Sequence, residues 1–259
     1  MRAHNEQMID VSMFKKIVRI TAKAILFLAL LSLLPVLIFR WVPAPGSMLM
    51  LERWYAARQN QQELHIEYQW RPYERIPDNL KLAVIASEDQ RFATHIGFDY
   101  AQIRNAYEHN KLGGTLRGGS SISQQVAKNL FLWPDRTYFR KAVEAWFTLG
   151  IELLWPKQRI LEMYLNIVEW DHGVFGIDAA TRHHFNIDAC ELSERQSSQL
   201  VAVLPSPLRW DPVQPPLYAQ ERALWIQDQM RRLERREYLD KFEVELVEVP
   251  HVNMACRRC

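Results

Sequence analysis

Two carboxylates stand side by side directly after an apolar run, in the segment IASEDQRFATHIGFD (residues 85–99). Partly apolar surroundings bring the pKa of a carboxyl group toward neutral pH, which suits a general base that deprotonates a hydroxyl. If residues 82–87 form a helix that packs inward, Glu88 lies near its end in such surroundings. The alternative is a solvated pair, Glu88 and Asp89, at a helix end, which is what most Glu-Asp dipeptides are.

A second segment, RGGSSISQQVAKNLFL (residues 117–132), could contact an anion. Two glycines before Ser120 lead into a serine that would cap a helix over residues 120–132. On one polar face of that helix Ser121, Gln125 and Lys128 follow one another at i, i+4 and i+7. By itself this face could equally be an ordinary exposed helix surface.

The third segment, DRTYFRKAVEAWF (residues 135–147), adds Arg136, Arg140 and Lys141, with Glu144 one helical turn beyond Arg140. An Arg–Glu pair at this spacing is usually a surface salt bridge worth roughly 0.3–0.5 kcal/mol. Together with Lys128, however, it brings four cations near two candidate carboxylates. Transfer of a sugar from a diphosphate needs both: a base for the attacking hydroxyl, and cations for the departing diphosphate.

The elements that must position these residues are mainly helical. Apolar residues recur at helical spacing in most segments after residue 47. Helices are predicted over residues 48–62, 80–87, 100–110, 120–132, 139–154, 157–169, 193–204 and 216–238. Strands are predicted only over 63–69 and 242–249. The segment 157–180 is predicted to be chiefly a core helix and turn, with Glu162 and Asn166 as supports for a site.

The N-terminal part contains sixteen uncharged residues, Ala24 to Phe39, which would form a helix about 24 Å long. Four cations precede this run within ten residues and only Arg40 follows it at once, so the positive-inside rule places the N-terminus in the cytoplasm. The alternatives are a cleaved signal peptide, for which the site VPAPGS is poor, or a buried core helix.

Composition bounds the remaining possibilities. The chain has 259 residues, 48% of them hydrophobic, so it can build a core, and its net charge of +2 gives no overall attraction to nucleic acid. Three cysteines, Cys190, Cys256 and Cys259, make no disulfide framework, and the last two are expected to lie in a frayed tail.

In this order, the segments resemble the five motifs of the peptidoglycan glycosyltransferase family, over roughly residues 80–215. The matching residues are Glu88-Asp89-x-x-Phe92-x-x-His95-x-Gly97, Gly119-Ser120-Ser121-Ile122-x-Gln124-Gln125-x-x-Lys128-Asn129, Arg140-Lys141-x-x-Glu144, Lys157-x-x-Ile160-Leu161-Glu162-x-Tyr164-Leu165-Asn166, and LPSPLRWDP at residues 204–212. The chain leaves no room for a transpeptidase, so it resembles the family's monofunctional members. It departs from the pattern at Ser121, at Asp171-His172 and in the polar segment 194–200.

The resemblance implies a mainly α, lysozyme-like glycosyltransferase domain with an N-terminal transmembrane helix and an apolar face beside the membrane. It implies an inverting enzyme that polymerises lipid II into β-1,4 glycan strands and releases polyprenyl diphosphate. Glu88 would be the base and Glu144 the second catalytic carboxylate. The implied substrate-binding residues are Asp89, Ser120, Gln125, Lys128, Asn129, Arg136 and Arg140.

The expected organisation is a cytoplasmic basic tail (1–23), a transmembrane helix (24–42), a linker or connecting helix (43–62) and a periplasmic glycosyltransferase domain (63–259), in a bacterial inner membrane. The expected partners are lipid II, the growing glycan strand and the membrane, with other cell-wall synthesis or division proteins as further candidates and no nucleic acid. A Mg²⁺ ion that assists departure of the diphosphate stays an open alternative, although the sequence shows no recognisable cluster of metal ligands. The alternative functions are a lytic, muramidase-like enzyme and a catalytically silent scaffold of cell-wall synthesis.

Overall fold

The computed structural model describes residues 2–111, 119–135, 137–233 and 238–241, and divides the chain into two compact units, 1–42 and 43–259. Arg136, Cys256, Cys259 and the strand expected over 242–249 lie outside the described residues.

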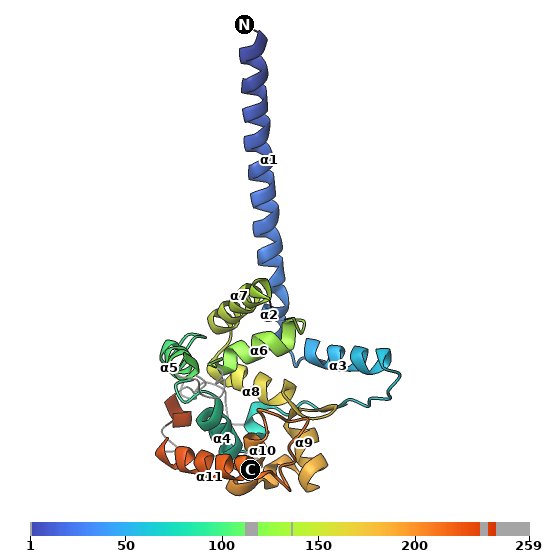
Figure 1. Ribbon diagram of the computed structural model, residues 1–259, viewed down its shortest axis with the longest axis vertical. Coiled ribbons are helices and arrows are strands. Elements are labelled where there is room, and N and C mark those ends of the chain that lie inside the picture. The colour runs from blue at the N-terminus through green and yellow to red at the C-terminus, as the bar shows by residue number, and fades with distance from the viewer. Residues whose placement is uncertain (1, 112–118, 136, 234–237, 242–259) are drawn as a thin grey trace, which may run out of the picture. The chain divides into compact units, whose positions relative to one another are not determined.

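The first unit is helical from its start. Helix α1 (Arg2–Ser32) is followed after Leu33 by the short helix α2 (Leu34–Phe39), with Pro35 in its first turn, where a proline costs no hydrogen bond (Figure 1). The basic tail expected before residue 24 is therefore part of the helix. Among the described residues, Met13–Phe39 is long and apolar enough to cross a membrane.

The second unit is mainly helical, as predicted, and also contains a small sheet (Figure 1). Its elements are α3 (Met48–Gln59), β1 (Glu67–Tyr68), the 3₁₀ turn η1 (Tyr73–Arg75), α4 (Asp78–Glu88), α5 (Tyr100–Lys111), α6 (Ile122–Phe131), α7 (Tyr138–Leu154), α8 (Lys157–Ile167), β2 (Glu169–Asp171), β3 (Val174–Phe175), α9 (Gly176–Phe185), the 3₁₀ turn η2 (Ala189–Glu191), α10 (Glu194–Ala202) and α11 (Leu217–Arg232).

Helix α8 forms the centre of this unit. All of its residues from Gln158 to Ile167 are buried, and it packs against α6, α7 and α9. Its buried Asn166 is satisfied internally: the side chain accepts a hydrogen bond from the backbone N–H of Arg71 (2.7 Å) and donates to the Arg71 carbonyl (2.9 Å). Asn166 therefore fixes the chain entering η1 against the central helix, which makes it a support of the fold.

One predicted helix end was wrong, and three elements were not predicted. The helix expected to reach residue 169 ends at Ile167, because Val168 is extended and leads into β2. The sequence analysis missed β2, β3 and α9. In the sheet the order is β1-β3-β2, with β3 parallel to β1 and antiparallel to β2. Strands of two or three residues leave too short an alternation of apolar and polar residues to be recognised.

The polar segment 194–200 forms most of α10, which packs closely against α4 and α11. Ser198 is buried and satisfied: its hydroxyl donates to the carbonyl of Arg195 (2.8 Å) and accepts from Nε2 of Gln227 (2.8 Å). Ser198 thus serves the packing of α10, whereas the hydroxyl of Ser197, which is also buried, has no hydrogen-bond partner among the described residues.

Candidate active site

Glu88 is the last residue of α4, whose preceding residues from Leu80 to Ala86 are buried. Its carboxylate accepts hydrogen bonds from Nε2 of Gln125 (3.1 Å) and from the Ser87 hydroxyl (2.9 Å). It also forms an ion pair with Arg222 on α11, at 3.2 Å. The Glu88 side chain keeps 17% of its surface exposed, so the carboxylate is held in place while a small reactant can still reach it.

Asp89, the next residue, lies inside the protein and its side chain has no exposed surface. Its two oxygens are each 2.8 Å from Nε2 of His95, and Oδ2 accepts a hydrogen bond from the backbone N–H of Ile122 (3.1 Å). The expected substrate contact of Asp89 does not fit this burial. Instead, Asp89 ties the loop after α4 to the first turn of α6, where a carboxylate also complements the helix dipole.

The start of α6 is fixed by a capping box. Ser121 is the N-cap, one residue later than expected: its hydroxyl accepts from the backbone N–H of Gln124, and the Gln124 side chain accepts from the Ser121 N–H (3.0 Å). The same hydroxyl donates to the carbonyl of Gly97. Gly97 has φ +76°, and a Cβ there would come within 2.7 Å of Thr148 Cγ2 on α7, so only glycine lets the loop pass this closely.

Lys128 lies on α6 one turn beyond Gln125 and is exposed. Among the residues that the structure describes, it has no hydrogen-bond or ion-pair partner. Although the residue is exposed, protein around its ammonium group lowers its pKa by desolvation; the charge of Glu144 opposes that shift, and the charges of Arg140 and Lys141 add to it. An unpaired cation beside other cations favours the binding of an anion.

Glu144, on α7, is 2% exposed. Arg140 contacts one of its carboxylate oxygens through Nη1 (2.8 Å), and the Lys141 ammonium contacts the other. The burial of this carboxylate is therefore compensated by two cations, the condition under which a buried charge is tolerated. The Arg140 side chain is itself 13% exposed, so its first role is to hold Glu144, and contact with a substrate stays a prediction.

Helix α6 is the element that joins these groups. It packs against both α7 and α8 (Figure 1). Its Gln125 hydrogen-bonds to Glu88, and its Lys128 interacts electrostatically with Glu144. Of the other predicted binding residues, Ser120 is half-buried and Asn129 is 7% exposed, both at α6. Arg136 lies outside the described residues.

Sequence reasoning missed two residues of this site. Arg222 pairs with Glu88 across 134 positions of the chain, a separation that no motif spacing reveals. Tyr164 lies within the fourth motif, and its hydroxyl donates to Oε1 of Gln125 (3.4 Å), orienting the amide that contacts Glu88. Burial raises the pKa of Tyr164 well above its ordinary value, and the charge of Glu88 adds to that effect, so Tyr164 stays a neutral donor.

Among the described residues of this site, the carboxylates of Glu88 and Glu144 do not fit a protein-held Mg²⁺. Mg²⁺ is usually bound through one or two carboxylates that supply oxygen ligands. Both oxygens of Glu144 face cations, and both oxygens of Glu88 accept hydrogen bonds from protein donors.

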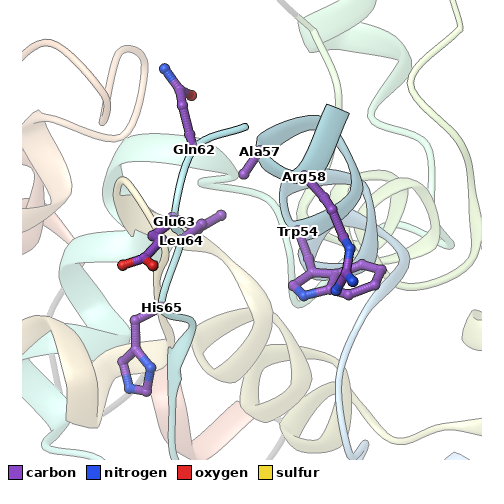
Figure 2. Close-up of a pocket in the computed structure, with 7 residues that line it drawn as sticks. All are labelled: Trp54, Ala57, Arg58, Gln62, Glu63, Leu64 and His65. Carbon is purple, nitrogen blue, oxygen red and sulfur yellow. The ribbon is translucent and has the colours of Figure 1, made fainter. Parts of the chain in front are cut away.

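Two hollows of the second unit lie elsewhere. One, of about 410 Å³, is lined by the end of α3 and the following chain, where Arg58 stacks on the Trp54 ring (Figure 2). The other, of about 220 Å³, surrounds Arg71 and Asp188. Neither of these two hollows is lined by Glu88 or Glu144.

Comparison with known proteins gives consistent matches. The family model described as transglycosylase matches residues 57–231. The chain is similar to proteins named biosynthetic peptidoglycan transglycosylase: it is 52% identical over 231 residues to that of Ectopseudomonas mendocina (strain ymp), covering 89% of this chain and 96% of the relative. It is 51% identical over 231 residues to that of Pseudomonas aeruginosa PAO1, covering 89% of this chain and all of the relative. For Pseudomonas savastanoi pv. phaseolicola the identity is 53% over 227 residues, 88% of this chain and 96% of the relative.

Proposed function

The chain belongs to the transglycosylase family, and from that premise we propose that it is a peptidoglycan glycosyltransferase, which polymerises lipid II into β-1,4 glycan strands and releases polyprenyl diphosphate. The observation that carries this proposal is the position of α6, whose Gln125 contacts Glu88 and whose Lys128 lies in the field of Glu144. One rigid helix thereby orients the base, which lies at the end of α4, and carries the anion-binding cation, as transfer from a diphosphate requires.

In the proposed reaction Glu88 takes the proton from the 4-hydroxyl of the acceptor sugar. The hydroxyl oxygen attacks the anomeric carbon of the donor from the side opposite the diphosphate. The bond between that carbon and the diphosphate oxygen breaks as the new bond forms, which inverts the anomeric centre. The bonding electrons leave with the diphosphate.

Lys128 stabilises the negative charge that grows on the leaving diphosphate. Glu144 holds Arg140 and Lys141 in position through its two ion pairs. Gln125 and Arg222 hold Glu88 in the orientation needed for proton transfer. Ser120, Asn129 and Arg136 are proposed to complete the binding of the substrate. Every step uses groups of the chain itself.

We place the second unit in the periplasm of a bacterium, with the N-terminus in the cytoplasm and Met13–Phe39 crossing the inner membrane. The apolar span and the cations that precede its most hydrophobic part support this orientation. Helix α7 also carries exposed apolar side chains at helical spacing, Phe139, Trp146, Leu149 and Leu153, which favours a surface that lies against lipid. Such a surface would bring Glu144, on the same helix, close to a lipid-linked donor.

The proposal is tested by incubating the purified protein with labelled lipid II, or separately with polymerised glycan, and separating the products by size. We expect polymer from lipid II, a loss of at least about a hundredfold in rate for Glu88→Gln, and an unchanged melting temperature. Glu74→Gln, a change at an exposed glutamate on η1, is the matched control and should leave the rate unchanged. Breakdown of glycan without polymer formation would instead identify a lytic enzyme, and no change in either substrate would identify a scaffold.

A further inference from the structure

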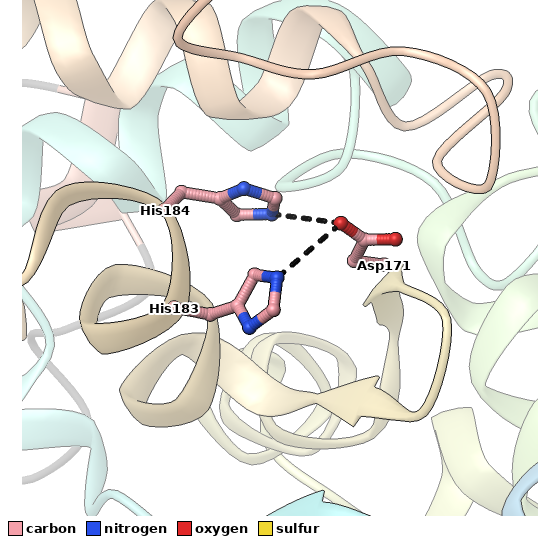
Figure 3. A group of neighbouring side chains, drawn as sticks. All are labelled: Asp171, His183 and His184. Carbon is pink, nitrogen blue, oxygen red and sulfur yellow. Dashed lines mark ion pairs between the residues drawn. The ribbon is translucent and has the colours of Figure 1, made fainter. Parts of the chain in front are cut away.

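A group of two histidines and one aspartate lies outside the candidate active site. His183 and His184 are in the last turn of α9, and Asp171 is the last residue of β2, just before the turn at Gly173. Figure 3 shows both imidazole rings directed at the Asp171 carboxylate. Nε2 of His183 is 3.5 Å and Nε2 of His184 is 3.9 Å from the same oxygen, Oδ2, and one ligand atom from each residue lies within 4.8 Å of the other two.

These separations are too long for hydrogen bonds but close to those of metal ligands. Ligand atoms about 2.0–2.1 Å from a tetrahedral Zn²⁺ lie roughly 3.3 Å from one another. Small side-chain rotations would therefore bring the three atoms onto one ion. They would leave a fourth position for water, as in open zinc sites with three protein ligands.

His184 provides an independent indication of a ligand. Its side chain is 5% exposed, yet its Nε2, the atom directed at Asp171, has no hydrogen-bond partner among the described residues. A buried polar atom is rarely left without a partner, because its desolvation costs about 1–3 kcal/mol. A bound cation at this point would satisfy the lone pair of Nε2.

The surroundings of His184 are also those of a metal-binding histidine. The ring is hydrogen-bonded to the backbone of Trp170, and Nδ1 faces Oδ1 of Asp211 at 3.9 Å. In metal sites the second ring nitrogen usually donates to a carboxylate or a carbonyl, which orients the imidazole and fixes its tautomer. Both kinds of group are present here.

We propose that Asp171, His183 and His184 bind a divalent transition-metal ion such as Zn²⁺, with Asp211 as a positioning residue for His184. The ion would link the turn of the β2–β3 hairpin to the C-terminal end of α9, so its role is to stabilise this corner of the unit. Imidazole nitrogen and carboxylate oxygen are ligands that Zn²⁺ accepts, whereas Mg²⁺ prefers oxygen ligands throughout. This site is separate from the groups assigned to glycan transfer and does not depend on that assignment.

The test uses the full-length chain in detergent, freed of metal with EDTA and then titrated with ZnCl₂ by calorimetry, with melting temperature as the second measurement. We expect one Zn²⁺ per chain and a higher melting temperature with zinc. His183→Ala, a change at an exposed residue, should leave the protein folded, weaken zinc binding at least tenfold and abolish the rise in melting temperature with zinc. Asp171→Asn should do the same, and Asp211→Asn should weaken binding about tenfold.

His172→Ala is the matched control, because His172 is exposed and adjacent to Asp171 but is not part of the group. Its zinc affinity should stay within twofold of the unchanged chain. Co²⁺ bound to the folded protein should give the visible absorption of a tetrahedral site, and His183→Ala should lose that absorption. The proposal is overturned if the unchanged chain binds no stoichiometric zinc, or if His183→Ala and His172→Ala bind it equally well.

Discussion

At the scale of single residues, adjacent side chains of the same type have different positions in the fold. Glu88 is held by donors from three elements and stays partly exposed, whereas Asp89 is fully buried and connects His95 to the start of α6. Glu144 is buried between Arg140 and Lys141, while Lys128 has no ion-pair partner among the described residues. Lys128, which has no ion-pair partner there, is therefore our candidate for binding the diphosphate, and Arg140 and Lys141, which are paired with Glu144, are positioning groups.

We predict that Lys128→Met slows glycan polymerisation about a hundredfold, because it removes a charge that stabilises the leaving diphosphate. The melting temperature should stay the same or rise slightly, since the folded protein lowers the pKa of Lys128 and its charged form is therefore less favoured in the folded than in the unfolded chain. Because the pKa of Lys128 is lowered, the ammonium group of the unchanged enzyme should lose its proton, and the enzyme its activity, at a lower pH than with a lysine of ordinary pKa. Rates of product formation between neutral and alkaline pH measure this.

Lys111→Met, at the exposed end of α5, is the control and should keep both the rate and its pH dependence. A large fall in melting temperature for Lys128→Met with unchanged specific activity would show that the residue is structural.

At the scale of elements, helix starts and ends determine where the functional side chains lie. Glu88 is available because α4 ends at it, and Gln125 and Lys128 lie on the site side of α6 because Ser121 begins that helix. The Ser121 hydroxyl takes part in both the cap and the contact with Gly97, so the loop after α4 and the start of α6 form one unit.

We predict that Ser121→Ala lowers the free energy of unfolding by about 1–2 kcal/mol, because it removes the helix cap and a buried hydrogen bond. Ser120→Ala, one residue earlier and only half-buried, should change it by less than about 0.5 kcal/mol. Denaturant unfolding of the two variants measures the difference. Equal effects at both serines would mean that the cap is not at Ser121.

At the scale of the whole molecule, the chain combines a long apolar helix with a unit that has its own core. Large fully buried side chains of residues 43–259, such as Phe92, Tyr164, Trp170 and Phe175, come from segments distant in the chain. Stability of this unit should therefore depend little on residues 1–42.

Deletion of residues 1–42 is expected to leave a folded protein whose melting temperature is within a few degrees of that of the full chain. Membrane association should weaken from that of an integral protein to association that salt or mild detergent disrupts. The reason is that the helix proposed to span the membrane is lost while the exposed apolar side chains of α7 remain. Thermal unfolding and vesicle flotation measure the two effects. A fragment that aggregates, or that still resists extraction as an integral protein does, would contradict this prediction.

The sequence by itself determined the helical class, the apolar N-terminal span and the residue types of the site, because helical periodicity, hydropathy and motif spacing are short-range properties of a chain. Glu88, Lys128 and Glu144 became candidates through the motif spacing and the resemblance to the family, and their roles stay predictions. Only the tertiary structure decided that Arg222 pairs with Glu88, that Asp89 is buried, and that Asp171 meets His183 and His184. These contacts join residues on separate elements. They form only when the elements pack together, and no local sequence pattern encodes that packing.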